Sequence, residues 1–152
     1  MGIYQQLTTE QLEVLILIEV ISKFEEGNEK LTTDLVEIID GNEMTKDSGE
    51  EICEVLEHYG YIETDTTEGI GYSLTLDGKQ YIKLFDEYLK AKDKNIEIVH
   101  NHFSLINIEK IQFSLVDSFK LFGIDIEATE VMKFVKGILD SISSIVKKSK
   151  KA

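Results

Sequence analysis

The sequence contains no arginine, no proline and no tryptophan, and it has a single cysteine, Cys53. One cysteine cannot form an internal disulfide, and an unpaired thiol is typical of a protein from a reducing compartment. The first residues lack the basic and then apolar order of a secretion signal. No run of about 18 uncharged apolar residues could span a bilayer. We therefore expect a cytoplasmic protein.

Positive charge is also scarce. The chain of 152 residues carries 29 acidic side chains against 16 lysines, which gives a net charge of −13. Residues 1–70 hold 18 acids and 3 lysines, whereas residues 71–152 hold 11 acids and 13 lysines. Such asymmetry predicts that the two halves of the chain meet different partners.

Sequence patterns that indicate catalysis are missing. We find no glycine-rich phosphate loop, no nucleophile elbow and no set of four metal ligands. His100 and His102 form a close pair, but no third ligand can be named, and we interpret them as ordinary polar residues. Cys53 lies among apolar helix positions and is interpreted as a buried, unreactive thiol. We expect no enzymatic activity, no cofactor and no metal.

The first clear pattern that is present is a helix over residues 8–27. Thr8 and Gln11 have the spacing of a capping box, and Gly27 is a stop signal. The run between them has more apolar positions than one helix face needs. We therefore expect this helix to be covered on two sides, by its own domain and by either the C-terminal helices or a second protomer.

Further helices and a hairpin are predicted downstream. A short helix is expected within residues 30–42, and a third over residues 48–60, where Ser48 and Glu51 again have capping-box spacing. The segments "YIET" and "IGYSLTL" read as two strands around the turn "DTTEG". Another helix follows in "LTLDGKQYIKLFDEYLKAK". The order is helix, helix, helix, hairpin, helix.

This order is that of a winged helix-turn-helix. The segment "GYIETDTTEGIGYSLTLDGKQYIKLF" resembles the wing and the following helix of MarR-like and PadR-like regulators, with Tyr72, Leu74, Thr75 and Gly78 at the family's wing-closing and helix-capping positions. The resemblance covers roughly residues 8–92. It implies a mainly α-helical fold with a small β-hairpin wing, and it implies a DNA-binding role.

The charge of the expected DNA-reading elements departs from that family pattern. No lysine occurs between Lys46 and Lys79, a gap that contains the whole third helix and the wing. Binding to duplex DNA depends on basic side chains that neutralise phosphates. We call the acidic side chains on these two elements the acidic surface; its members are Glu50, Glu51, Glu54, Glu57, Glu63, Asp65 and Glu68. A surface of this sign repels DNA, although glutamates can also line an ordinary solvated helix.

The C-terminal part has a different pattern. Residues 93–152 are predicted to form a mainly helical extension to the winged-helix domain of residues 1–92. The last helix has apolar residues at coiled-coil-like spacing, namely Val131, Val135, Ile138, Ile142 and Ile145. Its lysines would also suit an anionic membrane, but the apolar spacing favours packing against protein. We expect no membrane association and a homodimer held by this seam.

Two functional hypotheses follow. The first is a non-enzymatic regulatory or interaction protein whose acidic surface binds a basic protein partner, and in one version imitates DNA to occupy a DNA-binding protein. The alternative is a MarR-like or PadR-like transcriptional regulator that binds DNA through Lys23, Lys30, Lys46 or the lysine-rich C-terminal half. Direct DNA binding is not expected under the first hypothesis.

Overall fold

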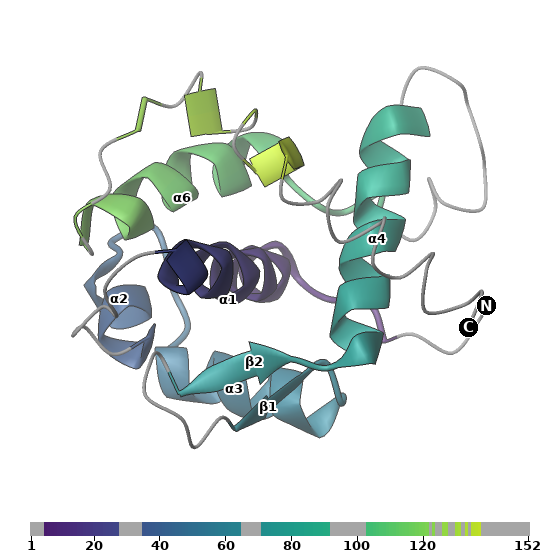
Figure 1. The fold of residues 1–152 in the computed structure, drawn as a ribbon, viewed down its shortest axis with the longest axis horizontal. Helices are drawn as coiled ribbons and strands as arrows, with labels where there is room; N and C mark the ends of the chain where they lie inside the picture. Colours follow the sequence, from purple (N-terminus) through teal and green to yellow (C-terminus); the bar gives the residue numbers. More distant parts are fainter. Residues whose placement is uncertain are drawn as a thin grey trace.

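The computed structural model describes residues 5–27, 35–64, 71–91 and 103–121, with residues 123, 126–127, 130–131, 133 and 135–137. The fold of these residues is mainly helical, with one small antiparallel sheet of two strands (Figure 1). Its elements, in chain order, are α1 (Thr9–Gly27), α2 (Leu35–Gly41), α3 (Gly49–His58), β1 (Ile62–Thr64), β2 (Tyr72–Leu74), α4 (Leu76–Ala91) and α6 (Ile108–Leu121).

Helix α1 is the centre of the molecule. It begins at the predicted capping box: the Thr8 amide donates to the Gln11 side-chain oxygen at 3.0 Å, and the Gln11 amide donates to the Thr8 hydroxyl at 3.2 Å. Every residue from 12 to 21 is buried. Figure 1 shows why, because α6 lies on one side of α1 and α3 with the hairpin lies on the other. The expectation of a helix covered on two sides is confirmed, and α6 supplies the second cover.

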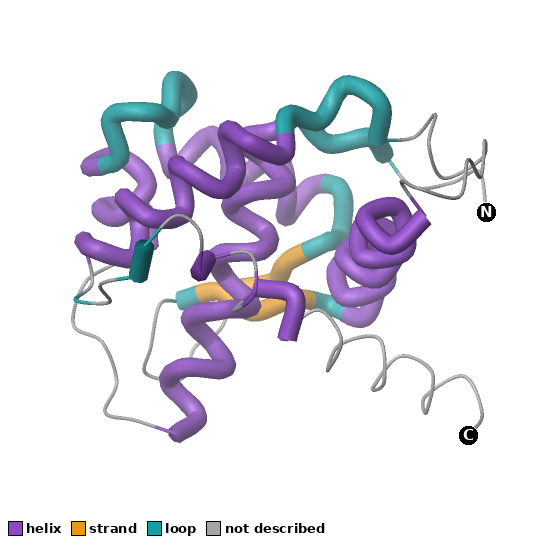
Figure 2. The backbone as a smooth tube through the Cα atoms, turned by 90° about the horizontal axis from the view of Figure 1, so that it is seen from above, coloured by secondary structure: helices purple, strands orange, loops and turns teal. Residues whose placement is uncertain are grey.

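The hairpin pairs β1 with β2 in the register Ile62 opposite Leu74 and Thr64 opposite Tyr72. Figure 2, seen from above, shows the two strands in orange near the middle of the molecule, with helices around them. Each strand has one buried apolar end, at Ile62 and Leu74, and these side chains join the common core. The short sheet therefore gains its stability from packing on α1 and α3 rather than from its own few hydrogen bonds.

Contacts at the start of α4 hold the hairpin against the end of α3. The Thr75 hydroxyl caps α4 by accepting from the Gly78 amide at 3.1 Å, and it also donates to the Gly60 carbonyl. Gly78 is buried against the Tyr61 carbonyl, where an added Cβ atom would overlap the backbone. A glycine at this position is thus required by close packing.

Aromatic side chains join α4 to the segments on either side of it. The Tyr81 ring packs at a tilt against Tyr61 and edge-on against Phe103, with ring centroids 4.9 and 5.6 Å away. Its hydroxyl accepts a hydrogen bond from the Leu7 amide at 3.0 Å. Burial raises the pKa of Tyr81 to about 12, so the phenol is neutral at physiological pH. These contacts join α4 to Tyr61 before it, to Phe103 after it and to Leu7 near the start of α1.

The described residues of the C-terminal part pack on the same core as α1 and α2. Helix α6 contacts both α1 and α2. The described residues between 130 and 137 are helical, and Val131 and Val135 are buried in the shared core. No helix in the described part of the chain has the length and apolarity needed to cross a membrane.

Candidate functional site

Helix α3 presents the acidic surface because of how its first turn is fixed. Ser48 caps the helix by accepting from the Glu51 amide at 3.2 Å, as predicted. The Gly49 amide donates to the Asp40 carboxylate at 2.7 Å, and Gly49 itself packs against the backbone of Val36 in α2. These contacts turn Ile52, Cys53 and Leu56 into the core.

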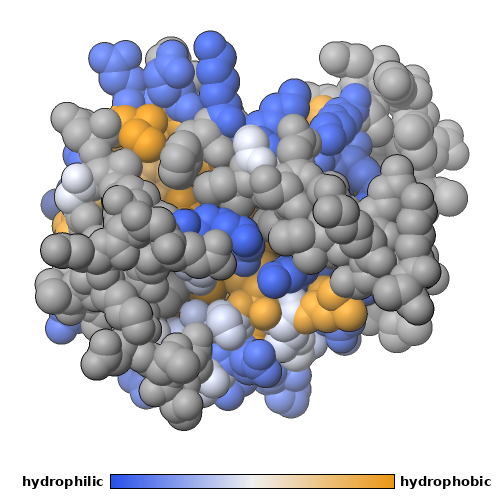
Figure 3. Space-filling model, in the orientation of Figure 1, coloured by the Kyte–Doolittle hydropathy of each residue, from blue (hydrophilic) through white to orange (hydrophobic). Residues whose placement is uncertain are grey.

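The remaining face of α3 points into solvent. All four of its glutamates in the acidic surface are exposed, and Glu63 on β1 is exposed as well; these residues are Glu50, Glu51, Glu54, Glu57 and Glu63. Asp65 and Glu68, the other two members predicted for this surface, lie outside the described residues. Figure 3 shows one face of the molecule, on which hydrophilic side chains alternate with smaller hydrophobic areas.

The carboxylates on α3 form no ion pair with another described residue. Ion pairs in the described part of the chain join Lys83 to Glu87, Lys90 to Asp86 and Lys110 to Glu10, none of them on α3. Glu57 accepts one hydrogen bond, from the Thr64 hydroxyl at 3.3 Å. Glutamates three or four residues apart on a helix repel each other by a few tenths of a kcal/mol per pair. The acidic surface is thus assembled at a cost to its own helix.

The other residues singled out in the sequence are placed as follows. Cys53 is buried, as predicted. Lys46 is exposed in the loop before α3, and Lys23 is half-buried near the end of α1. Lys30, His100 and His102 lie outside the described residues.

The predicted dimer seam is only partly described. Val131 and Val135 are 0 and 1% exposed in the single chain, so its own core already covers both side chains. Ile138, Ile142 and Ile145 lie outside the described residues. The homodimer stays a prediction from the sequence, and these two valines contribute to the fold of one protomer.

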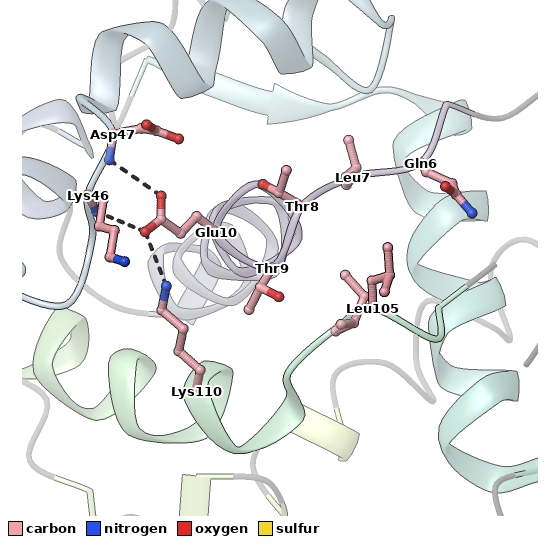
Figure 4. A pocket seen from close by; sticks show the side chains of 10 residues that line it. Gln6, Leu7, Thr8, Thr9, Glu10, Lys46, Asp47, Leu105 and Lys110 are labelled. Carbon is pink, nitrogen blue, oxygen red and sulfur yellow. Dashed lines mark hydrogen bonds and ion pairs between the residues drawn. The ribbon is translucent and has the colours of Figure 1, made fainter. Parts of the chain in front are cut away.

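A pocket of about 500 Å³ opens at the N-terminal end of α1. It lies between the start of α1, the loop before α3 and the turn that leads into α6, and Figure 4 shows it with its lining side chains. Its apolar lining comes from Leu7, Leu105 and Ile106. Leu105 is 91% exposed, so the pocket has an apolar rim that faces solvent.

Polar groups in this pocket hold three segments together. The Glu10 carboxylate accepts from the Lys46 amide at 2.8 Å and the Asp47 amide at 3.4 Å, and it pairs with the Lys110 ammonium at 3.2 Å. Figure 4 shows these three contacts converging on Glu10. Burial alone would raise the pKa of Glu10, but the two amides and Lys110 together hold it below its usual value. Glu10 is therefore a structural anion that fastens α1 to its neighbours.

The hydroxyl groups in the pocket have structural partners too. Thr8 accepts from the Gln11 amide, and Thr9 accepts from the Asn107 amide at 3.1 Å. Asn107 in turn caps α6 by accepting from the Lys110 amide at 3.0 Å. The pocket thus lies where the N-terminal ends of α1 and α6 meet, and its hydrogen bonds hold those two ends together.

A second carboxyl group, Glu13, lies deeper between α1 and α6. It is 2% exposed, and its Oε1 atom has no hydrogen-bond partner among the residues that the structure describes. Burial raises the pKa of Glu13 to about 7, against smaller opposing effects of a hydrogen bond with Ser114 and the charge of Lys110. The carboxyl is consequently divided between its protonated and ionised forms at neutral pH.

Asn42 completes this buried polar layer. Its side-chain amide donates to the Ser114 carbonyl and hydroxyl, each at 2.9 Å, and to the Ser118 hydroxyl at 2.8 Å. Its side-chain oxygen accepts from the Met44 amide at 2.9 Å. Ser114 and Ser118 are both buried, so one asparagine from the end of α2 satisfies polar groups on the buried face of α6.

Sequence reasoning missed Glu10, Glu13 and Asn42. A signal for the glutamates exists, since they stand at the start of a helix whose next residues are almost all apolar. A helix that is apolar on all sides is buried, and its acids are then buried with it. Asn42 has no such signal, because an Asn after a Gly-ended helix reads as an ordinary loop residue.

Comparison of the chain with protein-family models, with curated proteins and with solved structures finds no match. The described residues contain no group of three or more His, Cys, Asp or Glu side chains placed to hold a metal ion.

Proposed function

We propose that the chain is a non-enzymatic interaction protein built on a winged-helix domain, and that its acidic surface binds a basic patch on a protein partner. In this proposal α3 occupies the position of a recognition helix, and β1 and β2 form the wing. The order of α1, α2, α3, the hairpin and α4 supports this assignment. The pairing of β1 with β2 and the packing of α3 on α2 support it too.

One observation carries the proposal. The exposed face of α3 carries four glutamates, none of them in an ion pair with a described residue, on an element that would have to approach phosphates if the protein read DNA. Charge of this sign slows encounter with DNA and speeds encounter with a basic protein, because electrostatic attraction acts before contact. Where the partner is a DNA-binding protein, the acidic surface would imitate the phosphate backbone and occupy the same site.

The first experiment tests whether the chain binds DNA, whose negative charge has the same sign as the acidic surface. Fluorescence anisotropy with labelled random-sequence duplex DNA at low salt should show no binding by the wild-type chain. Sub-micromolar binding that weakens steeply as salt increases would contradict the proposal. It would support the alternative, a DNA-binding regulator that uses lysines outside α3.

The second experiment tests the acidic surface itself with matched variants. One variant changes Glu50, Glu54 and Glu57 to lysine. Its control changes three exposed glutamates away from α3, at positions 37, 109 and 130, to lysine, so that both variants have the same net charge. Host proteins captured at physiological salt should be retained by the wild type and the control but lost by the α3 variant. Equal loss in both variants would mean that net charge alone determines capture.

A further inference from the structure

Polar contacts add to the apolar packing of Ile111, Leu115 and Phe119 in holding α6 to the rest of the fold. Lys110 pairs with Glu10, Ser114 and Ser118 bind Asn42, and the Asn107 amide binds Thr9. Buried hydrogen bonds contribute less net free energy than apolar packing of the same size, and they depend on each partner's protonation state. A change in the protonation of a buried group at this contact can therefore weaken the attachment of α6. This holds whatever partner the acidic surface binds.

Glu13 is such a group. Four polar residues face it from the two packed helices: Lys110, Ser114 and Asp117 on α6, and Glu10 on α1 itself. Lys110 is already paired with Glu10, and the Ser114 hydroxyl is shared with Asn42. When Glu13 is ionised, its charge is therefore incompletely balanced by the described groups around it, and none of them hydrogen-bonds its buried Oε1 atom.

We infer that the α1–α6 contact is a proton-sensitive latch, which is closed while the Glu13 carboxyl is protonated and weakens when this carboxyl ionises. An unpaired charge between two packed helices favours any motion that admits water. Separation of α6 from α1 would let water reach Glu13, and it would also uncover apolar side chains of α1.

The raised pKa of Glu13 defines the pH range of the latch. The folded chain holds this proton up to about pH 7, whereas a solvated carboxyl loses it near its ordinary value of 4.5. The contribution of Glu13 to the free energy of unfolding is therefore greatest below pH 4.5. It falls as the pH rises to about 7 and is constant above that pH. The difference between a pKa of about 7 in the folded chain and 4.5 in solvent corresponds to a total change of roughly 300-fold in the equilibrium constant for opening. Glu10, whose pKa is lowered, titrates below this range.

The first test compares the wild type with Glu13→Gln, which keeps the shape of the side chain but cannot ionise. Urea unfolding of the full chain is measured by circular dichroism from pH 5 to pH 8. Between pH 5 and pH 8 the wild-type unfolding constant should rise by roughly 70-fold, because part of the full effect falls below pH 5, and the variant should lose this rise. Glu37→Gln, at an exposed position on α2, should keep it. A wild type without pH dependence, or a Glu13→Gln variant that keeps it, would overturn the latch.

The second test needs no variant. The carboxyl carbon of Glu13 is titrated by NMR in the wild-type chain, and amide hydrogen exchange, corrected for the intrinsic effect of pH, is measured at pH 5.5 and pH 8. The titration midpoint should lie near 7. From pH 5.5 to pH 8, the protection of the α6 amides against hydrogen exchange should fall more than that of the α3 amides. A midpoint near 4.5, or an equal loss of protection in both helices, would refute a latch at α6.

Discussion

Asn42 offers the sharpest test of how α6 is held, and we predict that Asn42→Ala destabilises the fold by about 3 kcal/mol. The side chain is 2% exposed; its two amide N–H groups are shared among three acceptors on α6, and its oxygen accepts from the Met44 amide. Each bond contributes roughly 0.5 to 1.5 kcal/mol net, and truncation also leaves buried groups on α6 without a donor. The residues it joins are more than 70 positions apart in the chain, with a separation of 72 to Ser114, so no local contact replaces the lost bonds.

The assay is urea unfolding followed by far-ultraviolet circular dichroism at a fixed pH of 6. A loss of about 3 kcal/mol should lower the urea midpoint by roughly 1.5 M with an unchanged slope. Asn107→Ala is the matched control, because Asn107 also lies at α6 but is exposed, and its side chain accepts one capping bond, from the Lys110 amide. Its loss should be about 1 kcal/mol. Equal losses in the two variants would show that Asn42 is not the buried connection that its contacts indicate.

Three further predictions concern other parts of the fold. Gly78→Ala should lower stability by about 3 kcal/mol in a thermal melt, because its Cβ atom would overlap the Tyr61 carbonyl; Gly137→Ala, which meets open space, should be neutral or slightly stabilising. The triple lysine variant of α3 should keep the wild-type circular dichroism spectrum, since its three positions are exposed and Lys is as good a helix former as Glu; a lost spectrum would mean that these glutamates serve the fold. Light scattering at tens of micromolar should give the mass of a homodimer, and a monomer mass would refute the seam prediction.

Much of the local structure follows from the sequence because its causes are local. The capping boxes at Thr8 and Ser48 predict where α1 and α3 begin; the Thr8 box forms both of its hydrogen bonds, and Ser48 accepts from the Glu51 amide. The hairpin around "DTTEG" and the helix after it also agree with the alternation and periodicity of their residues. Exposure of the glutamates on α3 follows from the same periodicity, since the opposite face is apolar.

Burial of single polar residues depends on tertiary contacts that no local pattern contains. Glu13 becomes a buried carboxyl only because α6, about a hundred residues further along the chain, packs over it. Asn42 has its buried partners on the same helix. The two valines of the predicted seam lie in the core of one chain, although their spacing alone is equally typical of a helix partner. Periodicity determines which face of a helix is apolar; the three-dimensional fold decides what covers it and which charges are enclosed.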